Sequence, residues 1–211
     1  MKKFLLVDDH DVVRSGVKRL LAEIFNLSDI HEAGDGDGAV EKIKQNSYDL
    51  ILMDIQMPKT DTLGLLEYIV VKDPEAKVLI FSMSSESIYA KRFLKAGAKG
   101  FISKEASLDE LITAIDLILN GRMYISENLT QSLAVASFSG EPNNPFNKLS
   151  AREFEIATLL LSGQSATDIT KSLNLQSSTV GTHKLRLFEK LGVTNLLELS
   201  ELARSYDMSG K

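Results

Sequence analysis

Phe4-Leu5-Leu6-Val7-Asp8-Asp9 and Leu50-Ile51-Leu52-Met53-Asp54 are two runs of four apolar residues that each end in acids. A short apolar run flanked by helical patterns is typical of a strand that is buried on both faces of a parallel sheet. Ligands of such sheets bind at the carboxyl ends of the strands. The two runs therefore predict a parallel sheet with Asp8, Asp9 and Asp54 in one pocket.

Five strand-like runs occur along the first half of the chain, and helical patterns separate them. Parallel strands need helical crossovers, so this alternation predicts a doubly wound α/β sheet whose switch point lies beside the first strand. The runs are Phe4–Val7, Ile30–Ala33, Leu50–Met53, Val78–Phe81 and Phe101–Ile102. Apolar residues at helical spacing mark two of the helices: Val13, Val17, Leu20, Leu21 and Ile24, then Leu108, Leu111, Ile112, Ile115 and Ile118.

The acidic pocket points to phosphoryl chemistry. Carboxylates that lie close together repel one another unless a cation neutralises them, and Mg²⁺ prefers oxygen ligands. A carboxylate beside Mg²⁺ can attack phosphorus and form an aspartyl phosphate. Lys104, which follows the fifth run, can pair with phosphate oxygens. A single acid after a strand is usually a turn residue or a helix cap, but the combination with Lys104 favours a shared site.

The last third of the chain is predicted to be helical. Ser150 and Glu153 have the spacing of a capping box, and Gly192 is a helix-ending glycine. Two short helices, a tight turn and a longer helix are the signature of a helix-turn-helix, whose second helix enters the major groove of DNA. The predicted helices run from Ser150 through Leu161, near Ala166–Leu173, over Thr179–Leu191 with Ser177 and Ser178 before it, and over Leu196–Ser205.

Turn-forming residues between the two regions mark a domain linker. Ser139-Gly140-Glu141-Pro142-Asn143-Asn144-Pro145 has no apolar face, and a short helix is expected around Leu129–Ala136. We therefore predict an N-terminal domain over residues 1–125, a linker over 126–147 and a DNA-binding domain over 148–211, with its helix-turn-helix at about 165–184.

Composition fits a two-domain cytoplasmic protein. The chain has 211 residues, 44% of them hydrophobic, and no cysteine, which suits a reducing compartment. No apolar run is long enough to span a bilayer or to form a signal peptide, so no membrane role is expected. Residues 148–211 carry eight basic and seven acidic residues, so DNA binding must rest on where the cations lie rather than on bulk charge.

The first 125 residues resemble the receiver domain of two-component response regulators, which has a flavodoxin-like fold with strand order 2-1-3-4-5. The motifs that match are Leu5-Leu6-Val7-Asp8-Asp9-His10, Leu52-Met53-Asp54-Ile55-Gln56-Met57-Pro58, Ser82, and Lys95-Ala96-Gly97-Ala98-Lys99-Gly100-Phe101-Ile102-Ser103-Lys104. Four separate strand ends thus carry the residues that this family uses.

The resemblance implies a role for each of these residues. Asp54 would be the phosphoacceptor, and Lys104 and Ser82 would contact the phosphoryl group. Ser82 and Phe101 would form the switch pair, in which the hydroxyl moves toward phosphate and the ring turns into the vacated space. Magnesium would be bound by Asp9, Asp54 and the backbone carbonyl of Gln56, with Asp8 acting through water.

Residues 148–211 resemble the LuxR-type helix-turn-helix of the NarL/FixJ subfamily. The motifs that match are Leu149-Ser150-Ala151-Arg152-Glu153, Gly163-Gln164-Ser165-Ala166-Thr167-Asp168-Ile169, Ser178-Thr179-Val180-Gly181-Thr182-His183 and Lys190-Leu191-Gly192-Val193. Apolar residues of these helices are predicted to form the core. Ser177, Ser178 and Thr179, at a helix N-terminus that favours phosphate, are predicted to bind DNA together with Thr182, His183, Lys184 and Arg186.

The last helix offers an apolar stripe, which this subfamily uses for dimerisation on paired half-sites. The residues of the stripe are Leu196, Leu197, Leu199 and Leu202. Core packing is the alternative use of such a stripe.

Two positions depart from these families. Thr62 stands where receivers usually have glycine, so a different loop shape beside Asp54 is expected. Gly181 stands where lysine is common, which removes a cation and costs the helix about 1 kcal/mol relative to alanine. The second change predicts weaker or differently specified DNA binding.

The function that follows is a transcription regulator phosphorylated on Asp54 by a histidine kinase. Its partners would be that kinase, double-stranded DNA, a second copy of the chain when active and RNA polymerase; its only catalysis would be Mg²⁺-dependent self-phosphorylation and dephosphorylation. One alternative is an atypical receiver controlled by dimerisation or a ligand. A haloacid-dehalogenase-type phosphatase is disfavoured, because Gln56 stands where those enzymes have a second aspartate as general acid.

Overall fold

The computed structural model describes residues 2–57, 60–131, 144–173 and 175–206. The chain forms two compact units, Met1–Gln131 and Ser132–Lys211, and each is described by itself. The domain boundaries predicted above stay predictions. At both ends of the predicted linker, however, a side chain is buried in a unit: Leu129 in the first and Phe146 in the second. Among the described residues, no helix has the length and apolarity needed to cross a membrane.

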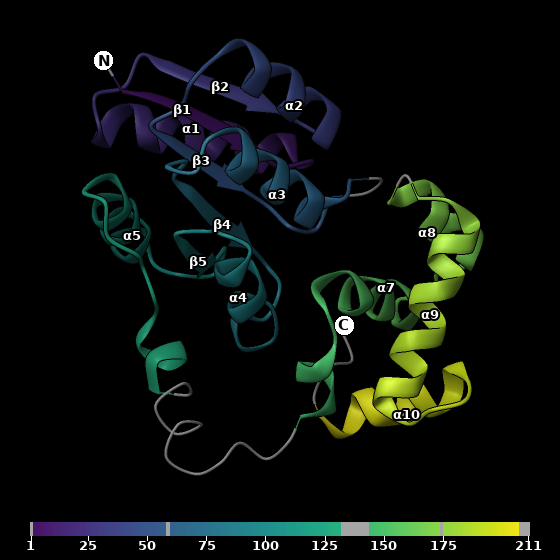
Figure 1. The fold of residues 1–211 in the computed structure, drawn as a ribbon. Helices are drawn as coiled ribbons and strands as arrows, with labels where there is room; N and C mark the ends of the chain where they lie inside the picture. The colour runs from purple at the N-terminus through teal and green to yellow at the C-terminus, as the bar shows by residue number, and fades with distance from the viewer. Residues whose placement is uncertain (1, 58–59, 132–143, 174, 207–211) are drawn as a thin grey trace. The chain divides into compact units, whose positions relative to one another are not determined.

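The N-terminal unit contains a parallel sheet of five strands in the order β2-β1-β3-β4-β5, which confirms the predicted fold (Figure 1). All four residues of β3 are buried, as expected for a strand covered on both faces. The strands are β1 (Lys3–Val7), β2 (Asp29–Ala33), β3 (Leu50–Met53), β4 (Val78–Ser82) and β5 (Gly100–Ser103). Each predicted run thus lies in a strand, and the ends differ by at most one residue.

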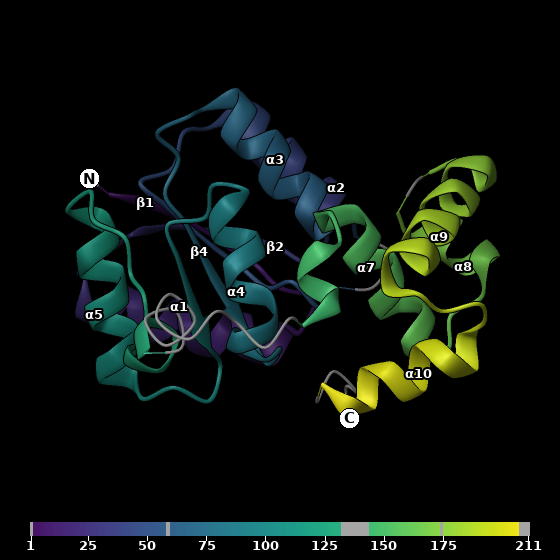
Figure 2. The same ribbon diagram turned by 60° about the horizontal axis from the view of Figure 1, so that its bottom comes forward.

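Four helices connect the strands, a fifth follows β5, and together they cover both faces of the sheet (Figures 1 and 2). They are α1 (Asp11–Ile24), α2 (Gly36–Gln45), α3 (Thr62–Lys72), α4 (Glu86–Lys95) and α5 (Leu108–Leu119). In α1 the predicted apolar face is only partly buried, since Leu21 is inaccessible while Leu20 and Ile24 remain exposed. The spacing of apolar residues predicted this face of α1 correctly, but it did not predict how far each residue is buried.

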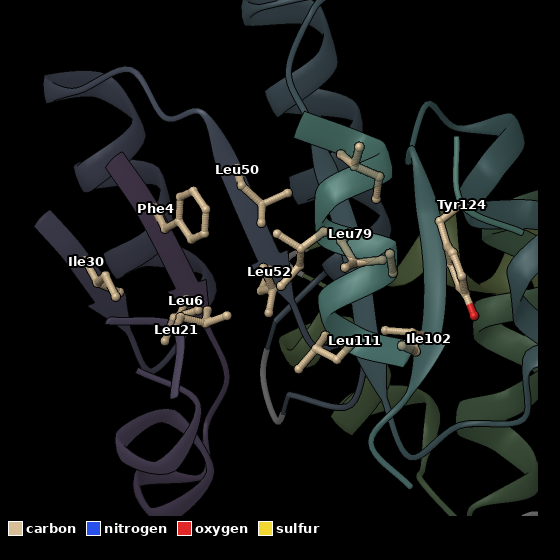
Figure 3. Close-up of a cluster of buried hydrophobic side chains, with 13 residues drawn as sticks. Phe4, Leu6, Leu21, Ile30, Leu50, Leu52, Leu79, Ile102, Leu111 and Tyr124 are labelled. Atoms are coloured by element: carbon tan, nitrogen blue, oxygen red, sulfur yellow. The ribbon is translucent and has the colours of Figure 1, made fainter. Parts of the chain in front are cut away.

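One core lies between the sheet and two of these helices, and Figure 3 shows its side chains meeting there. Alternate residues of a strand point to the same face, so this core contains every second residue of β1 and β3. Its members are Phe4, Leu6, Ile30, Leu50, Leu52, Leu79 and Ile102 from the strands, Leu21 from α1, Leu111, Ala114, Ile115 and Ile118 from α5, and Tyr124. The core fixes the strand ends that carry the acids.

The chain after α5 turns back onto the N-terminal unit; we call residues 122–131 the strap. The amide of Tyr124 donates to the carbonyl of Lys99 at 2.8 Å, which forms a parallel bridge to β5. The hydroxyl of Tyr124 donates to Glu110 at 2.5 Å, and that of Ser126 donates to Glu86 at 2.6 Å. The strap is therefore fastened to α5, β5 and α4.

The short helix expected in the linker is described only in part. Residues 127–131 are helical, while residues 132–136 of the predicted stretch Leu129–Ala136 lie outside the described residues.

The C-terminal unit is helical, as predicted. It consists of a 3₁₀ turn η1 (Pro145–Lys148) and the helices α7 (Ala151–Leu161), α8 (Ala166–Ser172), α9 (Ser177–Leu191) and α10 (Leu196–Ser205). The capping box of Ser150 and Glu153 is present, and Gly192 ends α9 with φ of 69°, in the left-handed region that favours glycine. The apolar residues predicted as core are buried: Ile169, Leu173, Val180, Leu187 and Leu191, with Leu175 partly so.

One expectation for this unit was wrong in detail, and the apolar stripe of the last helix is only partly exposed. The recognition helix α9 begins at Ser177 rather than Thr179, and its N-cap residue Gln176 makes no side-chain capping bond. Ser177 and Ser178 therefore lie in the first turn of the helix. In α10, Leu199 is fully buried, so it belongs to the core, whereas Leu196 and Leu197 are exposed.

Glu153 of α7 ties the two principal helices of this unit together. Its side chain is 3% exposed and accepts hydrogen bonds from the Ser150 amide at 2.7 Å and the Lys190 ammonium at 2.6 Å. Burial alone would raise the pKa of Glu153, but the bonds from Lys190 and Ser150 outweigh it and lower the pKa. The ionised carboxylate therefore stabilises the folded unit.

Replacing Glu153 by glutamine is expected to loosen α7 and α9. Losing a charge-assisted hydrogen bond costs about 1–3 kcal/mol. Because the folded pKa is depressed, the contribution is present above the unfolded pKa near 4.5 and is lost as pH falls through the folded pKa. Hydrogen exchange of α7 and α9 peptides in the full chain should show faster opening in Glu153→Gln at pH 7 and a smaller difference from wild type in acid. Exposed Glu201→Gln is the control; equal protection in both variants would contradict the assignment.

Candidate functional site

The acids come together because β1 and β3 are neighbours in the sheet. Val7 lies opposite Met53 in the parallel register, and the Asp54 amide donates to the Val7 carbonyl at 2.8 Å. The residues that follow the two strands, Asp8 and Asp54, therefore leave the sheet at the same level. The pocket predicted from the two apolar runs is formed.

Asp54 is buried and held by donors on both of its oxygens. Its Oδ1 accepts hydrogen bonds from the Ile55 amide at 2.6 Å, the Gln56 amide at 3.0 Å and the Ser82 hydroxyl at 2.6 Å. Its Oδ2 accepts one from the Lys104 ammonium at 2.7 Å. Only 3% of the residue is exposed, so these contacts fix the orientation of the carboxylate in a site shielded from water.

Lys104 neutralises two carboxylates at once. Its ammonium lies 2.6 Å from Asp8 and 2.7 Å from Asp54, and all three side chains are less than 10% exposed. Burial by itself would lower the pKa of Lys104, but the hydrogen bonds and charges of Asp54 and Asp8 together raise it. The lysine therefore stays charged and offers a cation at the point where an incoming phosphoryl group would add negative charge.

The acids also have the composition and spacing of a divalent-metal site. One ligand atom each from Asp8, Asp9, His10 and Asp54 lies within 4.8 Å of the others. Asp9 Oδ1 is buried and has no hydrogen-bond partner among the described residues, although the His10 ring lies 2.9 Å away. A buried carboxylate oxygen without a donor fits a metal ligand, and an oxygen-rich site fits a hard cation such as Mg²⁺.

Ser82 and Phe101 lie on the adjacent strands β4 and β5. Both side chains are buried, Ser82 completely, and Phe101 pairs with Ile80 in the β4–β5 register. The Ser82 hydroxyl already reaches Asp54, and the ring of Phe101 is only 1% exposed. Their role as a switch pair stays a prediction.

Thr62 causes no backbone strain. It is the first residue of α3, and among the described non-glycine residues only Asn26 has a positive φ. Its hydroxyl donates to the Ile55 carbonyl at 3.3 Å, and the preceding Asp61 caps the helix by accepting from the Gly64 amide. Thr62 is accommodated as the first residue of α3, and the different loop shape expected beside Asp54 stays a prediction.

Sequence reasoning missed several residues that support the pocket. His10 contributes a candidate ligand atom, and the Ile55 amide contributes a donor to Asp54. The guanidinium of Arg14 donates to the backbone carbonyl of Asp8 and lies 3.7 Å from Glu32 of β2. Arg14 could have been found from its position one turn into the helix that follows the acidic end of β1. Backbone donors such as the Ile55 amide leave no pattern in the sequence.

The predicted DNA-binding residues divide into two groups on α9. Ser177, Ser178, Thr182 and Arg186 are exposed, whereas Thr179, His183 and Lys184 are partly buried. The Thr182 hydroxyl donates to the carbonyl of Ser178 at 2.9 Å, and the Lys184 ammonium lies 5.5 Å from the centre of the Phe188 ring. Their contacts with DNA stay predictions.

His183 is set apart from the other candidates. It lies near Glu153 and Arg152 of α7, and its Nδ1 is buried without a hydrogen-bond partner among the described residues. Burial lowers the pKa of His183, the charge of Glu153 opposes this shift, and the charges of Arg152 and Arg186 add to it. A largely neutral imidazole between two helices is better suited to joining them than to binding phosphate.

Two family models cover most of the chain. Residues 4–116 match the response regulator receiver domain, and residues 147–203 match the bacterial regulatory proteins of the LuxR family. The first match contains the acidic pocket, and the second contains α7, α8 and α9.

Similar proteins span the whole chain. Response regulator GacA of Pseudomonas syringae pv. syringae is 38% identical over 209 residues, which is 99% of this chain and 98% of the relative. Response regulator UvrY of Escherichia coli is 33% identical over 204 residues, covering 96% and 94%. RcsB of Salmonella enterica serovar Typhimurium, solved bound to the promoter rprA with a phosphomimetic, has a TM-score of 0.74 at 22% identity and covers 95% of this chain and 97% of its own.

Proposed function

The chain belongs to the response regulators of two-component systems that join a receiver domain to a LuxR-family DNA-binding domain, and on that premise we propose that Asp54 carries its phosphoryl group. It is a DNA-binding transcription regulator that phosphorylation controls. The observation that carries the assignment is the position of Asp54, which is buried at the end of β3 between Ser82 and Lys104.

In the proposed step, a carboxylate oxygen of Asp54 attacks the phosphorus of a donor. A bond forms between that oxygen and phosphorus, and the bond from phosphorus to the leaving group breaks. The leaving group is the imidazole of a phosphohistidine on a sensor kinase, or acetate from acetyl phosphate. Lys104 and the Ser82 hydroxyl then bind oxygens of the transferred group, as charge-assisted hydrogen bonds favour. This self-catalysed transfer and its hydrolytic reversal are the only catalysis proposed.

Magnesium is the proposed cofactor, and when bound it would neutralise the phosphoryl oxygens during transfer. Asp9 and Asp54 would ligate it directly together with the backbone carbonyl of Gln56, and Asp8 would act through water. The orphaned Oδ1 of Asp9 supports this role.

The proposed output is a change in DNA binding. Phosphorylation adds negative charge and acceptor oxygens at Asp54. A shift of Ser82 and Phe101 would then alter the β4–α4 region, to which the strap is bonded through Ser126 and Glu86. Two copies of the chain would bind paired half-sites, with exposed Leu196 and Leu197 of α10 available for their contact. RNA polymerase would be a further partner, and the proposed compartment is the cytoplasm.

The test is whether a phosphodonor changes affinity for DNA. A duplex selected from a random library by the wild-type protein in the presence of Mg²⁺ and acetyl phosphate serves as the probe. Coupling free energies of 1–3 kcal/mol are typical, so we expect phosphorylation to tighten binding by about five- to 150-fold. Fluorescence anisotropy titrations of wild type with and without donor measure this ratio.

Asp54→Asn is the matched control, since it keeps the size of the side chain but cannot form the acyl phosphate. Its affinity should be the same with and without donor. Wild-type affinity that did not respond to a confirmed phosphoryl adduct would contradict the proposal and favour a receiver controlled by dimerisation or a ligand.

A further inference from the structure

The outward face of α9 has an unusual composition for a helix expected to meet DNA. Ser178, Gly181, Thr182 and Leu185 are spaced three and four residues apart, so they lie on one face. All four are exposed, while the opposite face carries buried Val180, Leu187 and Leu191. We call the four exposed residues the outer stripe.

Beyond Ser178, the outer stripe offers aliphatic surface at Thr182 and Leu185. Leu185 is 62% exposed, although leucine is otherwise the main core residue of this helix. The hydroxyl of Thr182 donates to the carbonyl of Ser178. Gly181 has no side chain, and a Cβ built at that position would meet nothing within 4 Å. Neither Gly181 nor Leu185 has a side-chain group that can hydrogen-bond to a base, and the Thr182 hydroxyl, whose proton is engaged, is left as an acceptor.

Cations flank the outer stripe instead of lying on it. Lys184 and Arg186 precede and follow Leu185, so each lies about a quarter turn from the leucine. The ammonium of Lys184 lies over the Phe188 ring, on the side of the helix rather than on its outward face. An apolar stripe between two positive charges is complementary to a groove of DNA, where base edges are exposed between two phosphate backbones. The stripe would contact the base edges, and the cations would bind the phosphates.

We propose that Leu185, together with the methyl group of Thr182, recognises the C5-methyl group of thymine in the major groove. Thymine is the base that displays an apolar group there, and aliphatic side chains contact it. Gly181 allows the helix backbone to approach the base edges closely enough for these short side chains to reach. The inference rests on the proposed function and specifies the sequences that the regulator prefers.

A second copy of the chain is a poorer occupant of this stripe. A stable protein interface buries about 800 Å² on each partner, which one leucine and one threonine methyl cannot supply. Two copies of α9 would also bring Lys184 and Arg186 of each chain against the same charges of the other.

The experiment compares thymine with uracil, which lacks only the methyl group. The probe is the duplex selected by the phosphorylated wild-type protein, synthesised with deoxyuridine in place of each thymidine in turn. Burying one methyl group corresponds to about a fourfold change in affinity, so at least one substitution should weaken wild-type binding by about that factor.

Leu185→Ala provides the coupling test. In this variant the thymine-to-uracil ratio at the same position should fall to about one, because the partner of the methyl group has been removed. Leu108→Ala on α5 is the matched control, since Leu108 is 41% exposed but lies outside α9, and its ratio should remain about four. Both leucines are exposed, and circular dichroism of the variants checks that the fold is retained.

The outcomes separate this inference from the proposed function. A wild-type protein that responds to the phosphodonor but binds thymine and uracil duplexes equally would overturn the inference alone. A uracil effect of the same size in Leu185→Ala and wild type would also overturn it, because another residue would then contact the methyl group. Failure to select any duplex would contradict both proposals.

Discussion

Intact mass spectrometry is expected to show one phosphoryl adduct on the wild-type protein after incubation with Mg²⁺ and acetyl phosphate, and none on Asp54→Asn. The reason is that Asp54 is the carboxylate held between Ser82 and Lys104, and an amide cannot form an acyl phosphate. The effect is all or none, which makes it the largest expected for any substitution in the chain.

Two controls sharpen this result. Asp116→Asn changes an exposed aspartate of α5 in the same way and should leave the adduct unchanged. Chelation of the metal should abolish the adduct on wild type, since the acidic cluster of Asp8, Asp9 and Asp54 needs a divalent cation for transfer. An adduct that persisted in Asp54→Asn would exclude Asp54 as the only acceptor.

Replacing Lys104 by methionine is expected to destabilise the receiver by about 3–5 kcal/mol in the absence of metal, the range measured when one partner of a buried ion pair is removed. The loss leaves Asp8 and Asp54 buried together without their shared cation. Thermal or urea unfolding of the full chain measures the change. Lys95→Met, on the exposed end of α4, is the matched control and should unfold close to wild type.

Two further measurements test the electrostatic cause. Asp54→Asn in the Lys104→Met background should restore part of the stability, because only one buried carboxylate remains. Added Mg²⁺ should stabilise Lys104→Met by binding to the folded state. If neither change raised the stability of the variant, lost packing of the lysine side chain rather than charge would explain the effect.

Much of the receiver could be predicted from its sequence because most of its strands contain short apolar runs. Every such run lies in a strand, and the chemistry-bearing residues follow directly at strand ends, where Asp8, Asp54 and Lys104 meet as expected. Ser82 and Asp54 are 28 residues apart in the sequence, so their contact could be assigned only by resemblance. The place of His10 in the candidate metal site could not be predicted either, because it depends on the path of the backbone after β1.

In the C-terminal unit, sequence patterns predicted the helices but not their exact starts, the burial of each leucine or the contacts between helices. Ser177 and Ser178 are good N-cap residues, yet α9 begins at Ser177 with Gln176 as its N-cap, since a capping preference of about 1 kcal/mol is easily outweighed by tertiary packing. Leucine spacing in α10 could not reveal that Leu199 faces the core. Glu153 and Lys190 are 37 residues apart, so no local sequence pattern predicts the hydrogen bond by which they join α7 and α9.

The strap also bears on how β5 is kept from pairing with other molecules. β5 is an edge of the sheet, and exposed edges are templates for intermolecular pairing and aggregation. Tyr124 bonds to the carbonyl of Lys99 and lies beside Gly100, so it occupies the first positions along that edge. An isolated receiver cut at the end of α5 would lose this cover, and a domain meant to remain monomeric should therefore be extended through Gln131.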